Sequence, residues 1–265
     1  NGTIIFAGVV DEEGNATGIK NLVKDKNLNP HYAIFGEPSG IDNITISYKG
    51  RLEIRLLCDV LNSAHASAPW ISLNAIEEIY FIWNDLKKAL DNSSAGIIKH
   101  KADSISYSVT EINGGVSHNV TPQKCRMTID IRIPTHSSCD DILKLIDNYI
   151  SGIKKDKNSL TIKYSVEDKT EPFLANTSSP LIRSLVLSIL DIRKKRPLLL
   201  KKTGTGDMNI LGNELNIPVV TYGPGDPHSS HTENERIFIG DYLTGIEVYK
   251  NTLLNILRLH KGLTK

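Results

Sequence analysis

The first candidates for chemistry are two adjacent carboxylates, Glu12 and Glu13, which follow the apolar run at residues 3–10. Two carboxylates this close repel each other, so one of them holds its proton more tightly unless a cation lies nearby. A site in which one carboxylate binds a metal while its neighbour takes a proton from water would use this pair. Adjacent acidic residues in an open turn are also common as plain surface charge, and the residues alone leave both interpretations open.

Two more groups with metal-binding chemistry follow short apolar segments. Glu37 lies in the segment 36–39, Gly-Glu-Pro-Ser, where it is either a ligand or an ordinary turn residue beside a proline. His231 lies in the loop 223–235, and two histidines and three acidic residues fall within ten positions of that loop. Histidine binds zinc readily, and nearby carboxylates can orient the ring. The alternative is a polar loop that leads into a helix.

Further polar residues have both a structural and a chemical interpretation. His65 stands among small residues, where it is either structural or able to donate a hydrogen bond to a developing oxyanion. Arg132 alternates with Asp130, so it either pairs with that residue or binds a carboxylate through its planar fork. The glycine-rich segment 203–207 lacks the Lys-Ser/Thr of a phosphate loop, and no Gly-x-Ser-x-Gly indicates a serine hydrolase.

The elements that must position these residues predict an α/β domain interrupted by an α+β domain. The run at residues 3–10 predicts a strand buried on both faces, followed by a helix at 18–24 and a strand at 31–35. The middle of the chain has the order β-α-β-β-α-β of a ferredoxin-like domain, with its elements at 44–59, 73–90, 104–112, 125–133, 139–153 and 160–166. A helix at 179–193, a strand at 219–222 and a helix at 240–260 follow. We therefore expect domains at 1–44, 45–168 and 169–265, the first and last forming one unit.

Composition excludes several classes of protein. Among 265 residues, Lys and Arg number 31 and Asp and Glu 30, so no basic excess indicates a nucleic-acid partner. No apolar run approaches the ~18 residues of a membrane-spanning helix. Cys58, Cys125 and Cys139 are odd in number and lack CxxC spacing, which predicts reduced thiols in a cytoplasmic protein, with Cys58 and Cys125 in the core. The chain starts at Asn1, directly before a predicted strand, which suggests a fragment of a longer protein.

The order of the motifs is more specific than any one of them. It resembles the dinuclear zinc amidohydrolases and peptidases that include succinyl-diaminopimelate desuccinylase, acetylornithine deacetylase and carboxypeptidase G. The segments 203–209 and 222–226 are most similar to the branch that acts on lysine or ornithine conjugates of an amino-group carrier protein, often named acetyl-lysine deacetylase. The motifs that carry the resemblance are Asp-Glu-Glu-Gly at 11–14, Gly-Glu-Pro-Ser at 36–39, Ser-Ala-His at 63–65, Asn-Val-x-Pro at 119–122, Asp-x-Arg-x-Pro at 130–134, Gly-Thr-x-Asp at 204–207 and His-Thr-x-x-Glu at 231–235.

This resemblance implies a zinc-peptidase-like catalytic domain, interrupted by a ferredoxin-like domain through which two chains form a homodimer. It implies that Glu12 is the general base, and that Glu13 and His231 bind one metal while Glu37 binds the other. His65 would act in the partner subunit's site. The residues that would contact substrate are Asn119, Arg132 and Thr205, with Arg132 holding a carboxylate. Two Zn²⁺ or Co²⁺ ions are expected per complete subunit.

The chain departs from the family at its front. The family has an earlier His-x-Asp motif and then an Asp that bridges the metals, and neither is found here. Two ligands rarely hold a catalytic zinc, which normally has three. We therefore expect this chain alone to be inactive or very weak, and the family enzyme to release lysine or ornithine by amide hydrolysis. A non-enzymatic dimerisation or carrier-binding module and a metallo-carboxypeptidase or dipeptidase are the alternatives.

Overall fold

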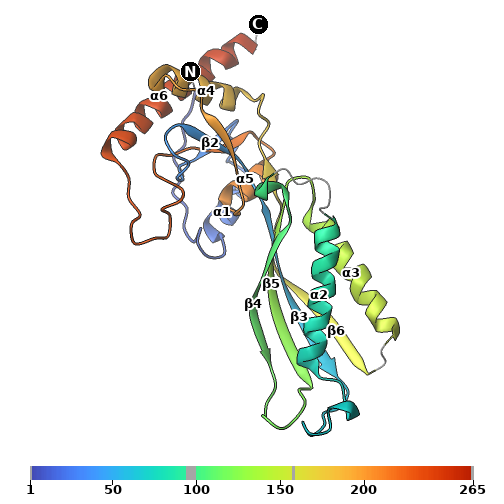
Figure 1. Ribbon diagram of the computed structural model, residues 1–265. Helices are drawn as coiled ribbons and strands as arrows, with labels where there is room; N and C mark the ends of the chain where they lie inside the picture. Colours follow the sequence, from blue (N-terminus) through green and yellow to red (C-terminus); the bar gives the residue numbers. More distant parts are fainter. Residues whose placement is uncertain (1, 94–99, 157–158, 264–265) are drawn as a thin grey trace. The chain divides into compact units, whose positions relative to one another are not determined.

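The computed structural model describes residues 2–93, 100–156 and 159–263, which fold as two compact units. Unit 1 combines residues 1–48 with residues 173–265, and unit 2 is the continuous segment 49–172. Each unit has its own sheet and its own core (Figure 1). The fold is the mixed α/β architecture expected from the sequence.

Unit 2 is a four-stranded antiparallel sheet in the order β4-β5-β3-β6, covered by two helices on one face (Figure 1). The succession β3, α2, β4, β5, α3, β6 in that strand order is the ferredoxin-like arrangement, so this prediction is confirmed. The elements are β3 (Gly50–Val60), η1 (Pro69–Ile71), α2 (Ala75–Ser93), η2 (Lys101–Asp103), β4 (Ser106–Gly114), β5 (Lys124–Ile133), α3 (Cys139–Asp156) and β6 (Leu160–Thr170).

The alternation of residue types explains why this sheet has one covered and one open face. Along β3, Leu52, Ile54 and Leu56 are fully buried beneath the helices, whereas Arg51 and Glu53 point to the open face. Helix α2 contributes its own apolar side to the same core. All three cysteines are reduced and buried, and the expectation that Cys58 and Cys125 belong to the core is confirmed.

Unit 1 is built on a mixed sheet in which β1 pairs in parallel with β9, β9 pairs antiparallel with β2, and β2 also pairs with β7 and β8. One hydrophobic cluster surrounds Ile44, Leu185 and Tyr222, and a second surrounds Ile19 and Met208. The elements are α1 (Thr17–Leu22), β1 (Ala33–Phe35), β2 (Asn43–Tyr48), β7 (Phe173–Leu174), α4 (Pro180–Arg193), β8 (Leu198–Lys202), α5 (Asp207–Leu215), β9 (Val219–Thr221) and α6 (Ile239–Leu263).

Local chemistry accounts for the ends of α4. The side chain of Ser179 accepts a hydrogen bond from the Ile182 backbone N–H, and Pro180 occupies the first turn, where its missing N–H costs nothing. The helix ends at Lys194, which adopts a left-handed conformation with φ of 56°. The predicted helix at 179–193 is thereby confirmed to within one residue.

One expectation about unit 1 was wrong. Residues 3–10 form no strand and are not buried: Phe6 is 95% exposed, because no described strand pairs with this segment. The β-type region expected at 44–59 consists of two strands, since the chain leaves one sheet after Tyr48 and enters the other at Gly50. Strand β8, which was not predicted, follows the basic run at 193–197 and pairs with β2.

Among the helices of the described residues, none combines the length and apolarity needed to cross a membrane.

Candidate functional site

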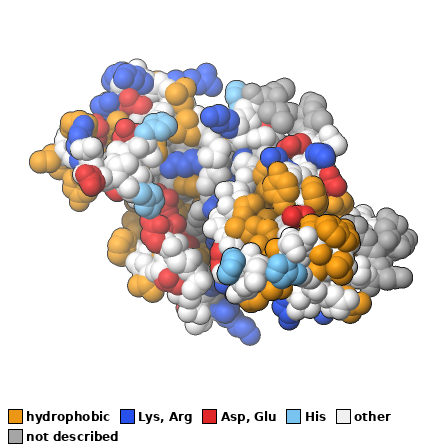
Figure 2. All heavy atoms as spheres, turned by 60° about the horizontal axis from the view of Figure 1, so that its bottom comes forward, with side chains coloured by type: hydrophobic (Ala, Val, Ile, Leu, Met, Phe, Trp, Pro, Cys, Tyr) orange, Lys and Arg blue, Asp and Glu red, His pale blue; other side chains and the backbone are white. Residues whose placement is uncertain are grey.

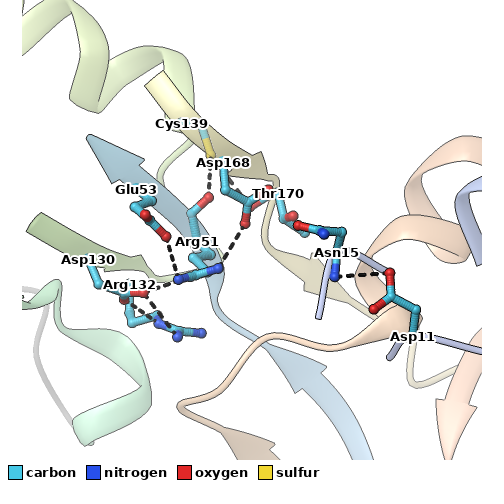
Figure 3. Close-up of polar contacts among 9 residues, drawn as sticks. All are labelled: Asp11, Asn15, Arg51, Glu53, Asp130, Arg132, Cys139, Asp168 and Thr170. Carbon is cyan, nitrogen blue, oxygen red and sulfur yellow. Dashed lines mark hydrogen bonds and ion pairs between the residues drawn. The ribbon is translucent and has the colours of Figure 1, made fainter. Parts of the chain in front are cut away.

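A tight turn in unit 1 presents the adjacent pair Glu12 and Glu13. Asp11 lies before it in the left-handed region, with φ of 63°. Its carboxylate accepts a hydrogen bond from the Asn15 backbone N–H at 3.2 Å (Figure 3). It also accepts one from the Thr17 hydroxyl at 2.7 Å. These bonds, with that of the Thr17 hydroxyl the largest influence, lower the pKa of Asp11. Asp11 therefore fixes the turn and is itself occupied.

Glu13 faces His231 across the site. His231 Nε2 lies 3.7 Å from Glu13 Oε1, although the turn and the loop that carry these residues are far apart in the sequence. The loop holds His231 with φ of 63°, and its backbone N–H donates to Glu235 Oε2 at 2.9 Å. Both facing side chains are exposed, so a ligand has access to them. A carboxylate and an imidazole at this separation are donors of the kind that zinc binds.

Glu37 follows the end of β1 and lies against the exit of β9. The Tyr48 hydroxyl donates to Glu37 Oε2 at 3.4 Å. A Cβ placed on Gly223 would lie 2.7 Å from the Glu37 carbonyl oxygen, so only glycine lets the two strand exits approach this closely. The position of Glu37 is thus set by backbone packing as well as by its hydroxyl partner.

The carboxylates of unit 1 influence one another strongly. Desolvation, followed by repulsion from Glu37, Glu13 and Asp207, raises the pKa of Glu12 to about 7. Burial and then repulsion from Glu37 raise the pKa of Asp207 to about 6. Glu12 is exposed as a whole residue, so its carboxylate is only partly withdrawn from water. These shifts show an acidic cluster, Glu12, Glu13, Glu37 and Asp207, whose charges are incompletely balanced.

Lysine and threonine residues border this acidic cluster. Lys202 donates to the Pro38 carbonyl at 2.8 Å and lies 5.9 Å from the Tyr48 ring centroid, and burial lowers its pKa. Thr205 is half-buried in the loop between β8 and α5. The next residue, Gly206, runs beside the general-base candidate, because a Cβ there would lie 3.7 Å from Glu12 Oε1.

His65 and Asn119 are brought together in unit 2. His65 forms an isolated bridge with Val120, and its Nδ1 lies 2.7 Å from the Ser67 hydroxyl. The Ala66 backbone N–H donates to the Asn119 carbonyl at 2.8 Å. The same loops border an open pocket of about 680 Å³, whose lining includes Ala66, Ile76, Gly115, His118 and Thr121.

Arg132 belongs to an ion network on the open face of the unit 2 sheet (Figure 3). Its Nε donates to Asp130 Oδ1 at 2.6 Å, and the second oxygen of Asp130 accepts from Arg51 at 2.6 Å. Arg51 also pairs with Glu53 and Asp168, at 2.7 and 3.2 Å. The structure therefore shows the pairing with Asp130 that was one of the two interpretations of Arg132.

Three residues of the site were not predicted from the sequence: Tyr48, Lys202 and Asp207. Tyr48 lies within a predicted strand and resembles any core aromatic, and Lys202 lies in the strand that was not predicted. Asp207 had a signal, since it follows a glycine-rich loop, but only the fold shows that it is buried.

The donor set fits a divalent metal only in part. The described residues contain no group of three or more His, Cys, Asp or Glu side chains that could hold a metal ion. Glu13 and His231 supply a suitable pair, and the surrounding negative charge favours a cation. A catalytic zinc normally has three protein ligands, so at least one further donor is needed for a complete centre.

The family model described as peptidase family M20/M25/M40 matches residues 1–255. The chain belongs to this family. A protein of Thermococcus kodakarensis named putative [LysW]-lysine/[LysW]-ornithine hydrolase is 32% identical over 262 residues, which cover 99% of this chain and 64% of that protein. A [LysW]-lysine/[LysW]-ornithine hydrolase of Saccharolobus solfataricus is 30% identical over 243 residues, covering 92% and 63%. The chain thus spans less than two thirds of these curated relatives.

Solved structures share the fold at low identity. Aminopeptidase PepT from Bacillus cereus matches with a TM-score of 0.73 and 16% identity, over 94% of this chain and 63% of that one. The M20 family metallo-carboxypeptidase Sso-CP2 from Sulfolobus solfataricus matches with a TM-score of 0.67 and 16% identity, over 90% and 67%. The zinc-peptidase-like fold with its ferredoxin-like domain is therefore confirmed.

Proposed function

We propose that this chain is part of a metal-dependent hydrolase that releases lysine or ornithine by cleaving an amide bond. The observation that carries the proposal is the approach of Glu13 to His231, at 3.7 Å, beside a glutamate whose pKa is raised to about 7. Family membership supports the reaction class. The names of the relatives support an amino acid joined to a carrier protein as substrate. An acetyl or succinyl group is the alternative acyl part.

Three residues of this chain would hold metal ions. The ions would be Zn²⁺ or Co²⁺, and a complete subunit would bind two of them. Glu13 and His231 would bind one, and Glu37 would bind the other with donors from outside the described residues. A metal bound there polarises the amide carbonyl and acidifies water. Glu12 takes the proton from the attacking water and returns it to the leaving amine, a task for which a pKa of about 7 is well suited.

The candidate substrate contacts are Thr205 in unit 1 and Arg132, His65 and Asn119 in unit 2. Thr205 lies in the loop that borders Glu12, where its hydroxyl can position the acyl group. Arg132 keeps 30% of its side chain exposed while bound to Asp130, and Asp130 thereby orients the guanidinium toward a substrate carboxylate. His65 and Asn119 share one loop region of unit 2. We assign His65 to an oxyanion contact in a partner subunit and Asn119 to a substrate contact.

A homodimer through residues 45–168 is part of the proposal. Unit 2 exposes large apolar side chains, among them Trp70, Ile71, Tyr80 and Phe81, each more than half exposed. Hydrophobic side chains gather in a patch on the face drawn in Figure 2. Contiguous apolar surface of this kind marks association sites, and a two-fold pair of such units would bury it. Three reduced, buried cysteines support a cytoplasmic location.

Zinc binding by the 265-residue chain tests the metal assignment directly. Titration calorimetry should detect binding that His231→Ala and Glu13→Gln each weaken by at least tenfold. His228→Ala is the matched control from the same loop and should bind as the unchanged chain does. Equal binding by all three variants would contradict the assignment of ligands.

A substrate panel tests the reaction. We expect this chain alone to show little or no turnover of N-acetyl-lysine, N-acyl-ornithine or a lysine-terminated peptide with added zinc or cobalt. A longer form that contains residues 1–265 should cleave one of them, and Glu12→Gln should abolish cleavage while leaving zinc binding intact. Cleavage restricted to peptides would favour a metallo-carboxypeptidase, and no cleavage by any form would favour a dimerisation or carrier-binding module.

A further inference from the structure

Asp207 is the first residue of α5, directly after the loop that borders Glu12. Its side chain is only 2% exposed. One of its carboxylate oxygens, Oδ2, is buried and has no hydrogen-bond partner among the described residues. A buried oxygen of this kind normally finds a donor, because leaving it without one costs free energy. The free-energy cost of burying this carboxylate must therefore be offset elsewhere.

Neighbouring charges raise the free-energy cost of ionising the Asp207 carboxylate further. Burial and then repulsion from the carboxylate of Glu37 raise the pKa of Asp207, and Lys20 opposes this only in part. The preceding residue, Gly206, lies beside Glu12, because a Cβ at residue 206 would be 3.7 Å from Glu12 Oε1 and 3.9 Å from the Tyr48 ring. Asp207 also acts on Glu12, whose pKa its negative charge helps to raise. Asp207 is therefore a buried member of the acidic cluster.

The N-terminus of α5 gives only modest support to this charge. A helix of nine residues offers its positive end to an acidic residue in the first turn, which Asp207 is. That contribution is small for a single helix and does not satisfy Oδ2. Asn209, the other polar side chain in that turn, instead accepts a hydrogen bond from the Gly206 backbone N–H at 3.2 Å. The Oδ2 oxygen thus has no hydrogen-bond donor among the described residues.

We propose that Asp207 is a positioning residue for cation binding: its buried carboxylate, with one oxygen that has no hydrogen-bond partner among the described residues, adds negative charge to the cluster of Glu12 and Glu37 and so raises the affinity of the site for a divalent cation. The inference rests on the proposed function, because it concerns the same site. Asp207 is not a ligand. It lowers the stability of the metal-free fold, and the cation offsets this cost when it binds.

Asp207→Asn tests the proposal because it keeps the shape and removes the charge. With a chelator present, the variant should unfold at a higher urea concentration than the unchanged chain. Zinc titration should show binding weakened by about tenfold, the effect of one nearby charge at an intermediate dielectric. Far-UV circular dichroism follows both units. Tryptophan fluorescence reports unit 2 alone, since Trp70 and Trp83 are the two tryptophans of the chain, and should not change.

Two further variants separate charge from structure. Lys20→Met removes the cation that offsets Asp207, so it should tighten zinc binding and lower the metal-free stability. Asp241→Asn removes an acidic residue from the first turn of α6 and should leave zinc binding unchanged. Together they show whether the sign of the charge near Asp207, and not any change in a helix end, governs binding.

The outcomes are distinct. A less stable or unfolded Asp207→Asn chain would overturn the inference, because the carboxylate would then be structural. Unchanged zinc affinity in that variant, with normal binding by the parent chain, would overturn the inference and leave the proposed function standing. No zinc binding by the parent chain would overturn the proposed metal site and this inference with it.

Discussion

The two units treat their charged residues in opposite ways. In unit 2 each arginine on the open face of the sheet has an acidic partner: Arg51 binds three carboxylates, Arg55 pairs with Glu167, and Arg126 pairs with Glu111. In unit 1 the acidic residues of the site influence one another: desolvation, followed by repulsion from Glu37, Glu13 and Asp207, raises the pKa of Glu12 to about 7. These arginines of unit 2 thus have carboxylate partners within the chain, whereas the charges of the acidic cluster of unit 1 are incompletely balanced.

Their hydrophobic cores differ in the same sense. Unit 2 is one continuous segment with a single cluster that joins β3, β5, α2 and α3. Unit 1 is assembled from two segments that are distant in the sequence and holds two smaller clusters. The difference is one of charge balance: the arginines on the open face of the unit 2 sheet are paired with carboxylates, and the carboxylates of the unit 1 cluster repel one another.

The largest effect should come from the core of unit 2. Ile129→Ala removes a fully buried side chain on β5, opposite Ile54, and should lower the free energy of unfolding by about 3–4 kcal/mol. Urea denaturation followed by tryptophan fluorescence measures it, because Trp83 lies in this core. Leu57→Ala, on β3 at 38% exposure, is the control and should cost about 1 kcal/mol or less. Similar losses for both would mean that unit 2 is loosely packed.

The ion network should come next. Asp130→Asn deprives both Arg51 and Arg132 of their carboxylate, whose side chain is only 13% exposed. We expect a loss of about 2–3 kcal/mol, because two charge-assisted hydrogen-bonded contacts weaken together. Glu111→Gln, which breaks an exposed pair with Arg126, should cost less than about 0.5 kcal/mol.

The same change, aspartate to asparagine, should destabilise the chain at Asp130 and stabilise it at Asp207. The first carboxylate is bound by two arginines, and the second has an oxygen without a donor among the described residues. If urea denaturation shows that both substitutions change the free energy of unfolding in the same direction, the two units do not differ in the balance of their charges.

Unit 2 was predictable because its information is local. Alternation along β3 and β5 and the apolar stripes of α2 and α3 each show within a few residues which side is buried. The alternative that Arg132 pairs with Asp130 was visible for the same reason, since residues two apart on a strand share a face.

Unit 1 was less predictable because its strands depend on distant partners. Residues 3–10 have the composition of a buried strand, but composition cannot supply a neighbouring strand. Strand β8 is basic at its end and becomes a strand only by pairing with β2. The closeness of Glu13 and His231 could likewise not be predicted from their positions in the sequence. Only the family resemblance implied that the two residues act together.

A backbone change at the site should have an intermediate effect. Gly223→Ala would place a Cβ 2.7 Å from the Glu37 carbonyl oxygen, and backbone atoms cannot move aside cheaply. The free energy of unfolding should fall by about 2 kcal/mol, and zinc binding should weaken as Glu37 shifts. Gly240→Ala is the matched control, since nothing lies within 4 Å of its Cβ position and it is in a helix. That control should gain about 0.5–1 kcal/mol in urea denaturation.

The smallest effect should be pH-dependent and should come from Glu12. Its folded pKa of about 7 lies above the ordinary 4.5, so between these values the folded chain holds the proton more tightly. Stability contributed by the neutral acid is therefore lost as pH rises from about 4.5 to 7. With a chelator present, Glu12→Gln should gain about 1 kcal/mol at pH 8, a value discounted because the residue is exposed, and nothing at pH 4. Asp11→Asn should have the opposite effect, since hydrogen bonds from Thr17 lower the pKa of Asp11. The variant should be less stable than the unchanged chain at neutral pH. This loss should shrink as the pH falls through the lowered pKa of Asp11. A gain for Glu12→Gln that is equal at both pH values would show that its charge is not what the acidic cluster opposes.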